Sequence, residues 1–565
     1  MPPLGPMVEL HRRDLTVLGS LTRLRVVQIV TAVAIILIGA LESWTHRFVI
    51  YSDGLSYLDI ADSYAAGHWS EALNAYWSPL YSWLIAAGKL IMGSSPQREL
   101  TILQTLNFLC FLAALVAFEF LIREILRSYR ESETPVFMVV AHLVFGWASL
   151  ALVATYRPHP DMLVMAFWLA ASSFILRINR TGRLADHLIL GVVLGLAYLA
   201  KTAMLVIALI TFAATVRSRR GMAGMAVFGV IAVPWIAAIS VQKGRVTIGD
   251  SGRLNYAWEV NGIRRSIHWQ SPEARHPTRV IRNSPEVFEF AEPQRAFYPP
   301  WRDPSYWYEG LRVPVALSNQ FRAIAANGRM VTVVLLSCPA LVALIVVLFR
   351  RRMPRPLSLI LIGSAAVAMY TSVFVEPRYV AGFVCVPSLI VLASAFSKSS
   401  EVERFFIASA AGIMFTGTVG FELLTDIQIL QSKTQNPDPM IAAGISAAGA
   451  GKSLVAYIGV GMSAYPVRLA GGRIICEIPA FHLRSRHDLA IVFGRTEIDG
   501  FWASQSEQKR EILGQMRQAG AAAVIADHVP AWADTVGWTF LGKRSWTVEP
   551  ERPESDARTY LYTLK

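Results

Sequence analysis

Long apolar blocks separated by short basic stretches run through the first three quarters of the chain. A helix needs roughly 20 apolar residues to cross a bilayer, and about eleven blocks bounded by charged residues approach that length. The blocks are 26–41, 101–126, 135–155, 162–178, 187–200, 202–216, 222–241, 331–349, 357–375, 380–396 and 405–424. The pattern predicts a polytopic α-helical membrane protein with about eleven transmembrane helices.

Composition excludes the soluble classes. Of 565 residues, 54% are hydrophobic and 16% are charged, whereas soluble domains carry about 25% charged residues. A disordered chain would be far more polar. The chain has four cysteines, three of them inside apolar blocks, so no disulfide framework is indicated.

The basic residues indicate how the chain crosses the membrane. Net charge is +13, and Lys and Arg gather at 11–25, 123–130, 177–183, 217–220, 350–355 and 398–404. Because positive loops stay on the cytoplasmic side, the basic N-terminus (1–25) is predicted inside and the C-terminal tail outside, in a bacterial inner membrane. The charge is thus a topology signal, and nucleic acid is not an expected partner.

This topology predicts the conformation of two segments. Residues 187–216 must form a hairpin with Lys201 near its outer apex, because the basic residues on both sides of the run are predicted cytoplasmic. Residues 79–92 are too short to span and are flanked by outer loops, so they should form an interfacial or re-entrant helix.

The tail at 431–565 has the pattern of a soluble domain. Short apolar runs at 455–460, 473–479, 488–494 and 521–527 predict strands, an amphipathic helix is expected at 507–519, and alternating TYLYTLK closes the chain. The glycines of Gly459–Gly461 indicate a tight turn, because the rest of a dinucleotide fingerprint is missing. The expected organisation is a transmembrane unit at 26–424, with outer loops 42–99 and 242–329, and a small extracytoplasmic (periplasmic) α/β domain.

Ionisable residues occur where the predicted helices reach the outer face, and buried charge near a bilayer is usually functional. Four separate turns carry them: Asp53, Asp59 and Asp62; Arg157, His159 and Asp161; Lys201; and Glu376, Arg378 and Tyr379. The long loop at 242–329 adds Arg253 and an aromatic set that suits either sugar rings or a headgroup belt: Tyr256, Trp258, Trp301, Tyr306, Trp307 and Tyr308.

Each of these residues also has a structural interpretation. Asp53 can cap a helix, Asp161 can complement a helix dipole, and Lys201 can extend its amine to the interface. Arg378 can pair with Glu376 alone. His159 and Asp161 supply two potential metal ligands without a third nearby, which is weak support for a metal site.

The order of these motifs resembles the GT-C superfamily of integral-membrane glycosyltransferases. The matching segments are SDGLSYLDIAD, SPLYSWL, RPHPDMLVMAFW, GLAYLAKTAML and EPRY, spread over 26–424. The similarity is to the branch with protein mannosyltransferases and lipid A aminoarabinose transferases. This chain has Ser78-Pro79 where a double proline is usual, and Asp53-Gly54 where Asp-Glu is common. The departure leaves open whether Asp53 acts alone or with Asp59.

The resemblance implies transfer of a sugar from a polyprenyl-phosphate donor to an acceptor hydroxyl of a glycan, lipid or protein. Asp53 is the expected general base, and a single base with in-line displacement predicts inversion. Lys201 and Arg378 are expected to stabilise the leaving phosphate, with Arg253 and Tyr256 as further contacts. Asp161 would orient the acceptor or sugar, or hold a divalent cation with Asp53. Asp59, His159, Glu376 and Tyr379 are secondary candidates, and no cofactor is implied.

Two other functions use similar residues. A transporter or flippase for lipid-linked sugars also needs charges in the membrane, but it would place them along helix middles. An outer-face glycan ligase or oligosaccharyl transferase would rely on Arg and His in the large loop and would not need Asp53 and Asp161.

Overall fold

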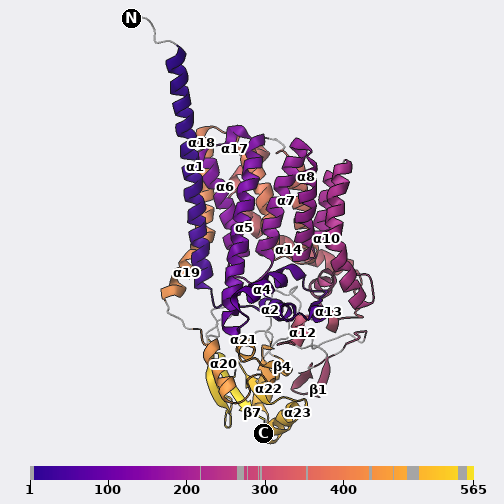
Figure 1. The fold of residues 1–565 in the computed structure, drawn as a ribbon. Helices are drawn as coiled ribbons and strands as arrows, with labels where there is room; N and C mark the ends of the chain where they lie inside the picture. Colours follow the sequence, from indigo (N-terminus) through magenta and orange to yellow (C-terminus); the bar gives the residue numbers. More distant parts are fainter. Residues whose placement is uncertain are drawn as a thin grey trace.

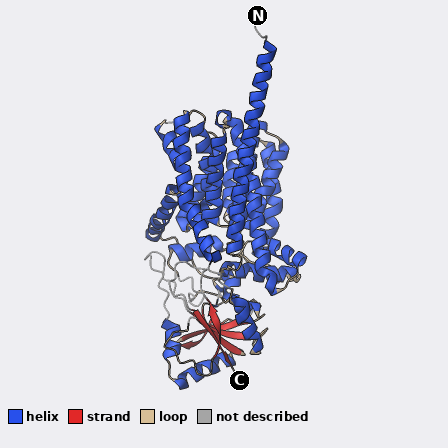
Figure 2. Cartoon of the chain, turned by 90° about the vertical axis from the view of Figure 1, so that its left-hand side faces the viewer, coloured by secondary structure: helices blue, strands red, loops and turns tan. Residues whose placement is uncertain are grey.

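The computed structural model describes residues 6–216, 218–263, 273–276, 278–290, 292, 296–350, 354–431, 436–461, 464–479, 496–527, 529–544 and 557–564. A helical bundle occupies one end of the molecule and a small domain with a β-sheet the other (Figures 1 and 2). Helix α1 (Pro6–Thr45) runs along the bundle and extends beyond the end that lies away from the sheet (Figure 1).

Seven helical segments of the described chain are long and apolar enough to cross a membrane: Leu24–Thr45, Pro96–Ser128, Pro135–Val153, Asp161–Thr181, Arg219–Lys243, Pro377–Phe396 and Glu401–Gln431. They correspond to α1, η1–α5 (Pro96–Arg98, Glu99–Ser128), α6–η3 (Pro135–Gly146, Trp147–Val153), α7 (Asp161–Thr181), α10 (Arg219–Lys243), α17 (Pro377–Phe396) and α18–η5–α19 (Glu401–Phe415, Thr416–Gly420, Phe421–Gln431). The chain is a multi-pass membrane protein, as the apolar pattern predicts.

Three further predicted spans form shorter apolar helices, α8 (Leu184–Ala200), α9 (Met204–Thr215) and α16 (Leu357–Val373). The predicted break at Lys201 is confirmed, since this residue has an extended backbone between α8 and α9. By length and composition, seven helices of the described residues can cross a membrane, or eight with one bent pair, and the predicted count of eleven is not confirmed.

The prediction of one continuous span at 331–349 is wrong. Helix α14 (Leu317–Leu336) ends there and α15 (Leu341–Phe349) continues at an angle of 92°. Pro339 lies in the break. Its ring removes a backbone donor and disfavours helical geometry in the preceding residue, which explains the bend.

Local sequence explains several helix ends. Ser400 and Glu403 form a reciprocal capping box at the start of α18. Thr134 accepts a hydrogen bond from the Phe137 amide at the start of α6, where Pro135 occupies the first turn. Helix α7 ends at Gly182, whose φ of 59° is left-handed and therefore favours glycine.

Short helices cover the bundle end that faces the sheet. They are α2 (Ser52–Ala65), α3 (Trp69–Ala72), α4 (Pro79–Met92), α11 (Ser251–Asn255), η4 (Tyr256–Val260), α12 (Pro299–Arg302) and α13 (Pro304–Trp307). The one-turn η2 (Arg130–Ser132) lies at the opposite end of α5. Helix α4 has the bounds predicted for the short interfacial helix, and Figure 1 shows α2 and α4 between the bundle and the sheet domain.

Among the described residues, the sheet has seven strands in the order β1-β2-β4-β3-β5-β7-β6. Their bounds are β1 Arg279–Asn283, β2 Glu286–Glu289, β3 Leu454–Gly459, β4 Arg473–Pro479, β5 Ala523–Ala526, β6 Thr539–Arg544 and β7 Ala557–Thr563. The central β4, β3 and β5 are parallel and the pairs outside them are antiparallel. The domain also has α20 (Asp438–Ala447), α21 (Tyr465–Leu469), α22 (Thr496–Ala503) and α23 (Ser506–Gln518).

The predicted strands at 455–460, 473–479 and 521–527, the closing strand and the helix at 507–519 are all present within a few residues. The predicted strand at 488–494 lies outside the described residues. Strands β1 and β2 come from the long loop between α10 and α14, so the sheet is not built from 431–565 alone. The pairing of β2 with β4 spans a large sequence separation, which local patterns do not report.

The two faces of the sheet have different partners. Ala456, Ile458 and Ile478 belong to one apolar core with Phe501 of α22 and Ile512 of α23. On the other face, a second core joins the sheet to the bundle end through Tyr457, Ile525, Leu58 of α2, Tyr81 of α4 and Ile441 of α20. The sheet domain and the bundle end therefore share one apolar core.

An ion cluster, here named the acidic clamp, reinforces this contact. Arg468 of α21 is buried against Asp59 and Asp62 of α2 and Glu99 of α5. Its Nη2 lies 2.7 Å from Glu99 Oε1, and the buried Lys89 Nζ lies 2.8 Å from the same oxygen. Three carboxylates from the bundle end thus bind one cation of the sheet domain.

Candidate active site

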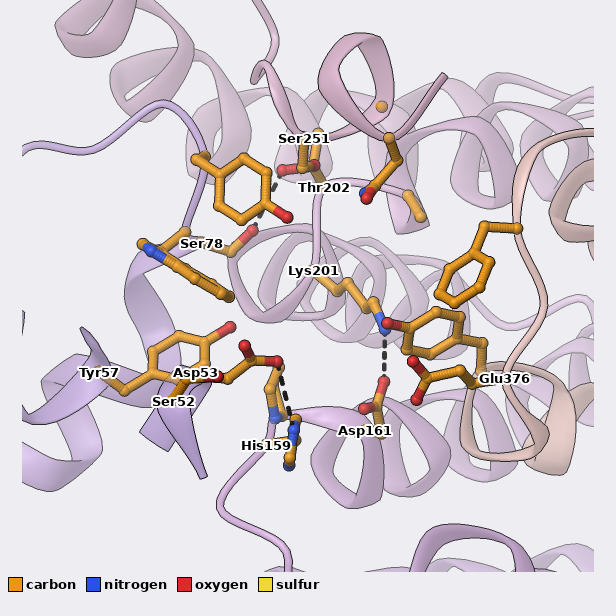
Figure 3. Close-up of a pocket in the computed structure, with 18 of the residues that line it drawn as sticks. Ser52, Asp53, Tyr57, Ser78, His159, Asp161, Lys201, Thr202, Ser251 and Glu376 are labelled. Atoms are coloured by element: carbon orange, nitrogen blue, oxygen red, sulfur yellow. Dashed lines mark hydrogen bonds and ion pairs between the residues drawn. The ribbon is translucent and has the colours of Figure 1, made fainter. Parts of the chain in front are cut away.

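A cavity of about 700 Å³ lies between the bundle end and the sheet domain. Its charged lining comes from the ends of separate elements: Asp53 in the first turn of α2, His159 just before α7, Asp161 at its start, Lys201 between α8 and α9, and Glu376 and Arg378 at the start of α17. A helix start or a break fixes each position, so residues far apart in sequence converge on one space (Figure 3).

Asp53 is held from three sides. Trp301 Nε1 donates to Asp53 Oδ1 at 3.2 Å, and His159 Nε2 lies 3.3 Å from Oδ2 (Figure 3). Arg378 Nη2 lies 3.8 Å from the same Oδ2. The Asp53 side chain is 23% exposed, so this carboxylate is oriented but still accessible from the cavity.

Asp161 is the centre of a second, more buried ion cluster. Lys201 Nζ lies 2.5 Å from its Oδ1 (Figure 3), and Arg378 Nε lies 3.6 Å from its Oδ2. Arg378 Nε also lies 2.7 Å from Glu376 Oε2. The Lys201 ammonium lies 3.6 Å from the ring centroid of Tyr379, a cation–π contact. Two fixed cations are therefore placed beside two carboxylates.

The surroundings of His159 favour the neutral form of its imidazole. Burial lowers its pKa below the ordinary value, and the nearby Arg378 cation lowers it further. Because the Asp53 carboxylate only accepts hydrogen bonds, His159 Nε2–H is the donor in their contact. The imidazole thus orients Asp53 without adding a full positive charge.

The structure brings together most of the residues selected from the sequence. Asp53, Asp161, Lys201, Arg378, Arg253, His159, Glu376 and Tyr379 all line the cavity. Two others do not: Asp59 is part of the acidic clamp, and Tyr256 lies at the start of η4 with its hydroxyl buried.

Arg253 is the lining cation contributed by the long loop. Its Nη1 donates to the Leu311 carbonyl at 2.9 Å, while Nε and Nη2 are buried and make no hydrogen bond within the described residues. Asp250 Oδ2 is 3.9 Å from Nη2, a longer ionic contact. Arg253 therefore has donor capacity for an anionic ligand.

The sequence motifs assign no role to several residues that line the cavity. Arg157 belongs to the same turn as His159 and could have been included on that ground. The hydroxyls of Ser78 and Thr202 lie 3.1 Å apart at the cavity (Figure 3). In the sequence Trp301 is one of several aromatic residues of the long loop. Its contact with Asp53 could not be predicted, because the two residues are 248 positions apart.

Within the part of the chain that the structure describes, no group of three or more His, Cys, Asp or Glu side chains is arranged to hold a metal ion. The carboxylates of the cavity are instead contacted by Lys, Arg, His and Trp donors. This arrangement suits a base beside an anion-binding group.

The chain's arrangement, a multi-pass bundle with charged helix ends at one mouth and an α/β domain over them, has counterparts among solved structures. No family model and no curated protein sequence matches the chain.

The chain has the fold of ArnT from Cupriavidus metallidurans. It superposes on the apo crystal structure with a TM-score of 0.52 at 13% identity, covering 95% of this chain and 98% of that one. The crystal structure of ArnT bound to undecaprenyl phosphate gives a TM-score of 0.50 at 13% identity, covering 94% and 97%. The GT-C resemblance indicated by the sequence motifs is thus confirmed for the fold.

Proposed function

We propose that the protein is a glycosyltransferase that moves a sugar from a polyprenyl-phosphate donor to an acceptor hydroxyl, with inversion at the anomeric carbon. One observation carries the proposal: a partly exposed carboxylate, Asp53, shares a cavity with a buried cluster of two cations. Those are the two groups that this displacement requires, a base for the nucleophile and a charge for the leaving group.

In the proposed reaction Asp53 accepts the proton of the acceptor hydroxyl. The hydroxyl oxygen forms a bond to the anomeric carbon while the bond from that carbon to the donor phosphate oxygen breaks. The electron pair of the broken bond stays with the lipid phosphate. Trp301 and His159 both donate to Asp53, which fixes the carboxylate orientation before the acceptor arrives.

Lys201 and Arg378 would stabilise the negative charge that grows on the leaving phosphate. Arg presents a planar fork suited to phosphate oxygens, and Lys presents a point charge. Asp161 contacts both cations and so sets their positions. Arg157 and Arg253 line the same cavity and provide further positive charge.

A lipid-linked donor is supported by the fold comparison, since ArnT from Cupriavidus metallidurans was solved bound to undecaprenyl phosphate. The location of the cavity at one end of the bundle fits a substrate whose tail remains in the bilayer. We further propose an inner-membrane location with the N-terminus cytoplasmic and the cavity at the outer face. The acceptor would be a glycan, lipid or protein hydroxyl.

The test is in-vitro transfer by the purified chain, offered radiolabelled polyprenyl-phosphate sugars with crude envelope acceptors. Asp53→Asn should lower transfer about 10²- to 10⁴-fold, the usual contribution of a general base. Asp534→Asn, an exposed carboxylate of the sheet domain, is the matched control and should keep wild-type transfer. Equal transfer by Asp53→Asn and wild type would refute Asp53 as the base and favour a ligase-type mechanism.

A further inference from the structure

The turn that precedes α7 has an unusual backbone conformation and is held from outside. Ala154 has φ 67° and ψ 141°, a region that residues with a side chain rarely adopt. Such strain persists only where the surrounding structure enforces it, and it clusters at active sites. Glu42 of α1 enforces it on one side, since its Oε2 accepts hydrogen bonds from the Thr155 amide at 3.2 Å and hydroxyl at 2.9 Å. The same turn carries Arg157 and His159 to the cavity.

Two amide side chains of α5 bind the next two carbonyls of this turn. Gln104 Nε2 donates to the Tyr156 carbonyl at 3.1 Å. Asn107 Nδ2 donates to the Arg157 carbonyl at 2.9 Å. The carbonyl end of the Asn107 amide accepts from Tyr81 OH at 2.5 Å, which fixes the orientation of the amide. Three consecutive residues before α7 are therefore bonded by side chains of α1 and α5.

The two amides of α5 lie where a polar side chain needs a partner. Gln104 and Asn107 belong to the apolar block 101–126, and both are buried. Being three positions apart, they lie on one face of the helix. Burying an amide costs free energy unless its hydrogen bonds are made. The Arg157 carbonyl that Asn107 binds also accepts from the His159 amide at 2.8 Å, so this contact closes the turn.

Arg157 is the cation that the turn presents to the cavity. Lys201, Arg253 and Arg378 also line the cavity, and each of them contacts a carboxylate. Arg157 forms no ion pair with any residue that the structure describes, and its buried Nε makes no hydrogen bond there. Its positive charge is therefore less compensated than that of the other three lining cations.

We propose that Gln104 and Asn107 are positioning residues, which fix the turn so that the Arg157 guanidinium binds the phosphate of the lipid-linked donor. Arg presents a planar fork suited to phosphate oxygens. A fork that is held in place before the ligand arrives loses less conformational freedom on binding. The inference rests on the proposed function, and it gives Arg157 a defined role in binding the donor.

The test measures binding of undecaprenyl phosphate to the purified full-length chain, which does not depend on turnover. Arg157→Gln should weaken binding about tenfold, the effect of losing one charged hydrogen bond. Undecaprenol, which has the same hydrocarbon chain without the phosphate, should bind wild type and Arg157→Gln alike. Asn107→Leu should weaken undecaprenyl phosphate binding by a smaller factor, because Arg157 is still present but no longer held.

A double variant separates positioning from a merely structural role. In the Arg157→Gln background, Asn107→Leu should cause no further loss, because the side chain that it positions is already gone. Equal losses in both backgrounds, or no loss in either, would overturn the positioning role. Gln104→Met repeats the test if a lowered unfolding temperature shows that Asn107→Leu folds poorly. Gln28→Leu removes an amide of α1 that bonds Glu119 away from the cavity, and this matched control should bind like wild type.

The outcomes also separate this inference from the proposed function. Undecaprenyl phosphate that binds wild type and Arg157→Gln equally well overturns the role of Arg157 and leaves the transferase proposal standing. Absence of undecaprenyl phosphate binding to wild type contradicts the lipid-phosphate donor of the proposed function, and the inference fails with it.

Discussion

At the scale of single residues, the site is organised around buried charges that depend on one another. Asp161 contacts both Lys201 and Arg378, and its side chain is only 4% exposed. A buried ion pair contributes little net stability, but removing one partner leaves the other charge without compensation. The cluster is therefore expected to constrain the site more than it stabilises the fold.

Asp161→Asn should test this coupling. Loss of the carboxylate leaves two cations facing each other, and we expect a destabilisation of about 3–5 kcal/mol. Combining it with Lys201→Met removes one of those cations and should recover part of the stability without restoring transfer. Unfolding in detergent, followed for both single variants and the double variant, measures the coupling. Strictly additive losses would show that Asp161 and Lys201 do not interact energetically.

Most of the candidate site could be predicted because its residues lie at helix ends, which are local features. Asp53, Asp161, Lys201 and Arg378 were found because each follows or begins an apolar block. Trp301 could not be found in this way, because its contact with Asp53 depends on how the long loop folds back.

At the scale of elements, the acidic clamp determines how α21 of the sheet domain sits on α2. Arg468→Gln would leave the Asp59, Asp62 and Glu99 carboxylates with Lys89 as the remaining clamp cation. We expect the sheet domain to separate from the bundle more readily, so limited proteolysis should release it faster than from wild type. Arg517→Gln, an exposed arginine of α23, serves as the control. Identical cleavage rates for both variants would contradict a docking role for Arg468.

The clamp also predicts a pH dependence of stability. Burial raises the pKa of Asp59 from 3.8 to about 6, against the opposing effect of Arg468. A raised acid pKa means that the folded state binds the proton more tightly, so Asp59 lowers stability as pH rises from about 4 to about 6. Burial of Asp62 is outweighed by Arg468 and Lys89, which lower its pKa. Its titration therefore changes the stability only below about pH 4.

Asp59→Asn isolates this effect. Its unfolding temperature relative to wild type should increase between pH 4 and pH 6 and then remain level up to pH 8. Thermal unfolding of both proteins across this range, in one detergent, provides the measurement. A difference that is constant with pH would show that Asp59 titrates normally in the folded protein.

Elements with a strong local pattern were predictable, and those set by distant contacts were not. Helix α4 and strands β3 and β4 lie within a residue of the predicted bounds, because their apolar runs end at Gly, Pro or charged residues. The β1–β2 hairpin comes from a polar loop and exists through pairing with β4. The α14–α15 bend shows that hydropathy alone does not detect a proline-induced break within an apolar block.

At the scale of the whole molecule, the basic clusters gather at the bundle end away from the sheet domain. Arg220 donates to the Gly182 carbonyl, and Arg180 pairs with Glu124 at 3.2 Å. Tyr129 OH donates to the Arg355 carbonyl, and Arg350 donates to the Lys398 carbonyl. Five clusters, those at 123–130, 177–183, 217–220, 350–355 and 398–404, are thus linked at one end. A single orientation of the bundle places all of them on the same side of the membrane.

Cysteine labelling in oriented membrane vesicles tests which side that is. The four natural cysteines, at 110, 338, 385 and 476, are buried and give low background. Ser218→Cys is exposed beside the basic cluster at the start of α10, and Glu507→Cys is exposed on α23. Because positive loops remain cytoplasmic, a membrane-impermeant maleimide should label Glu507→Cys in right-side-out vesicles and Ser218→Cys in inverted ones. Detergent should expose both. The reverse pattern would place the cavity on the cytoplasmic side, where an outer-face acceptor could not reach Asp53.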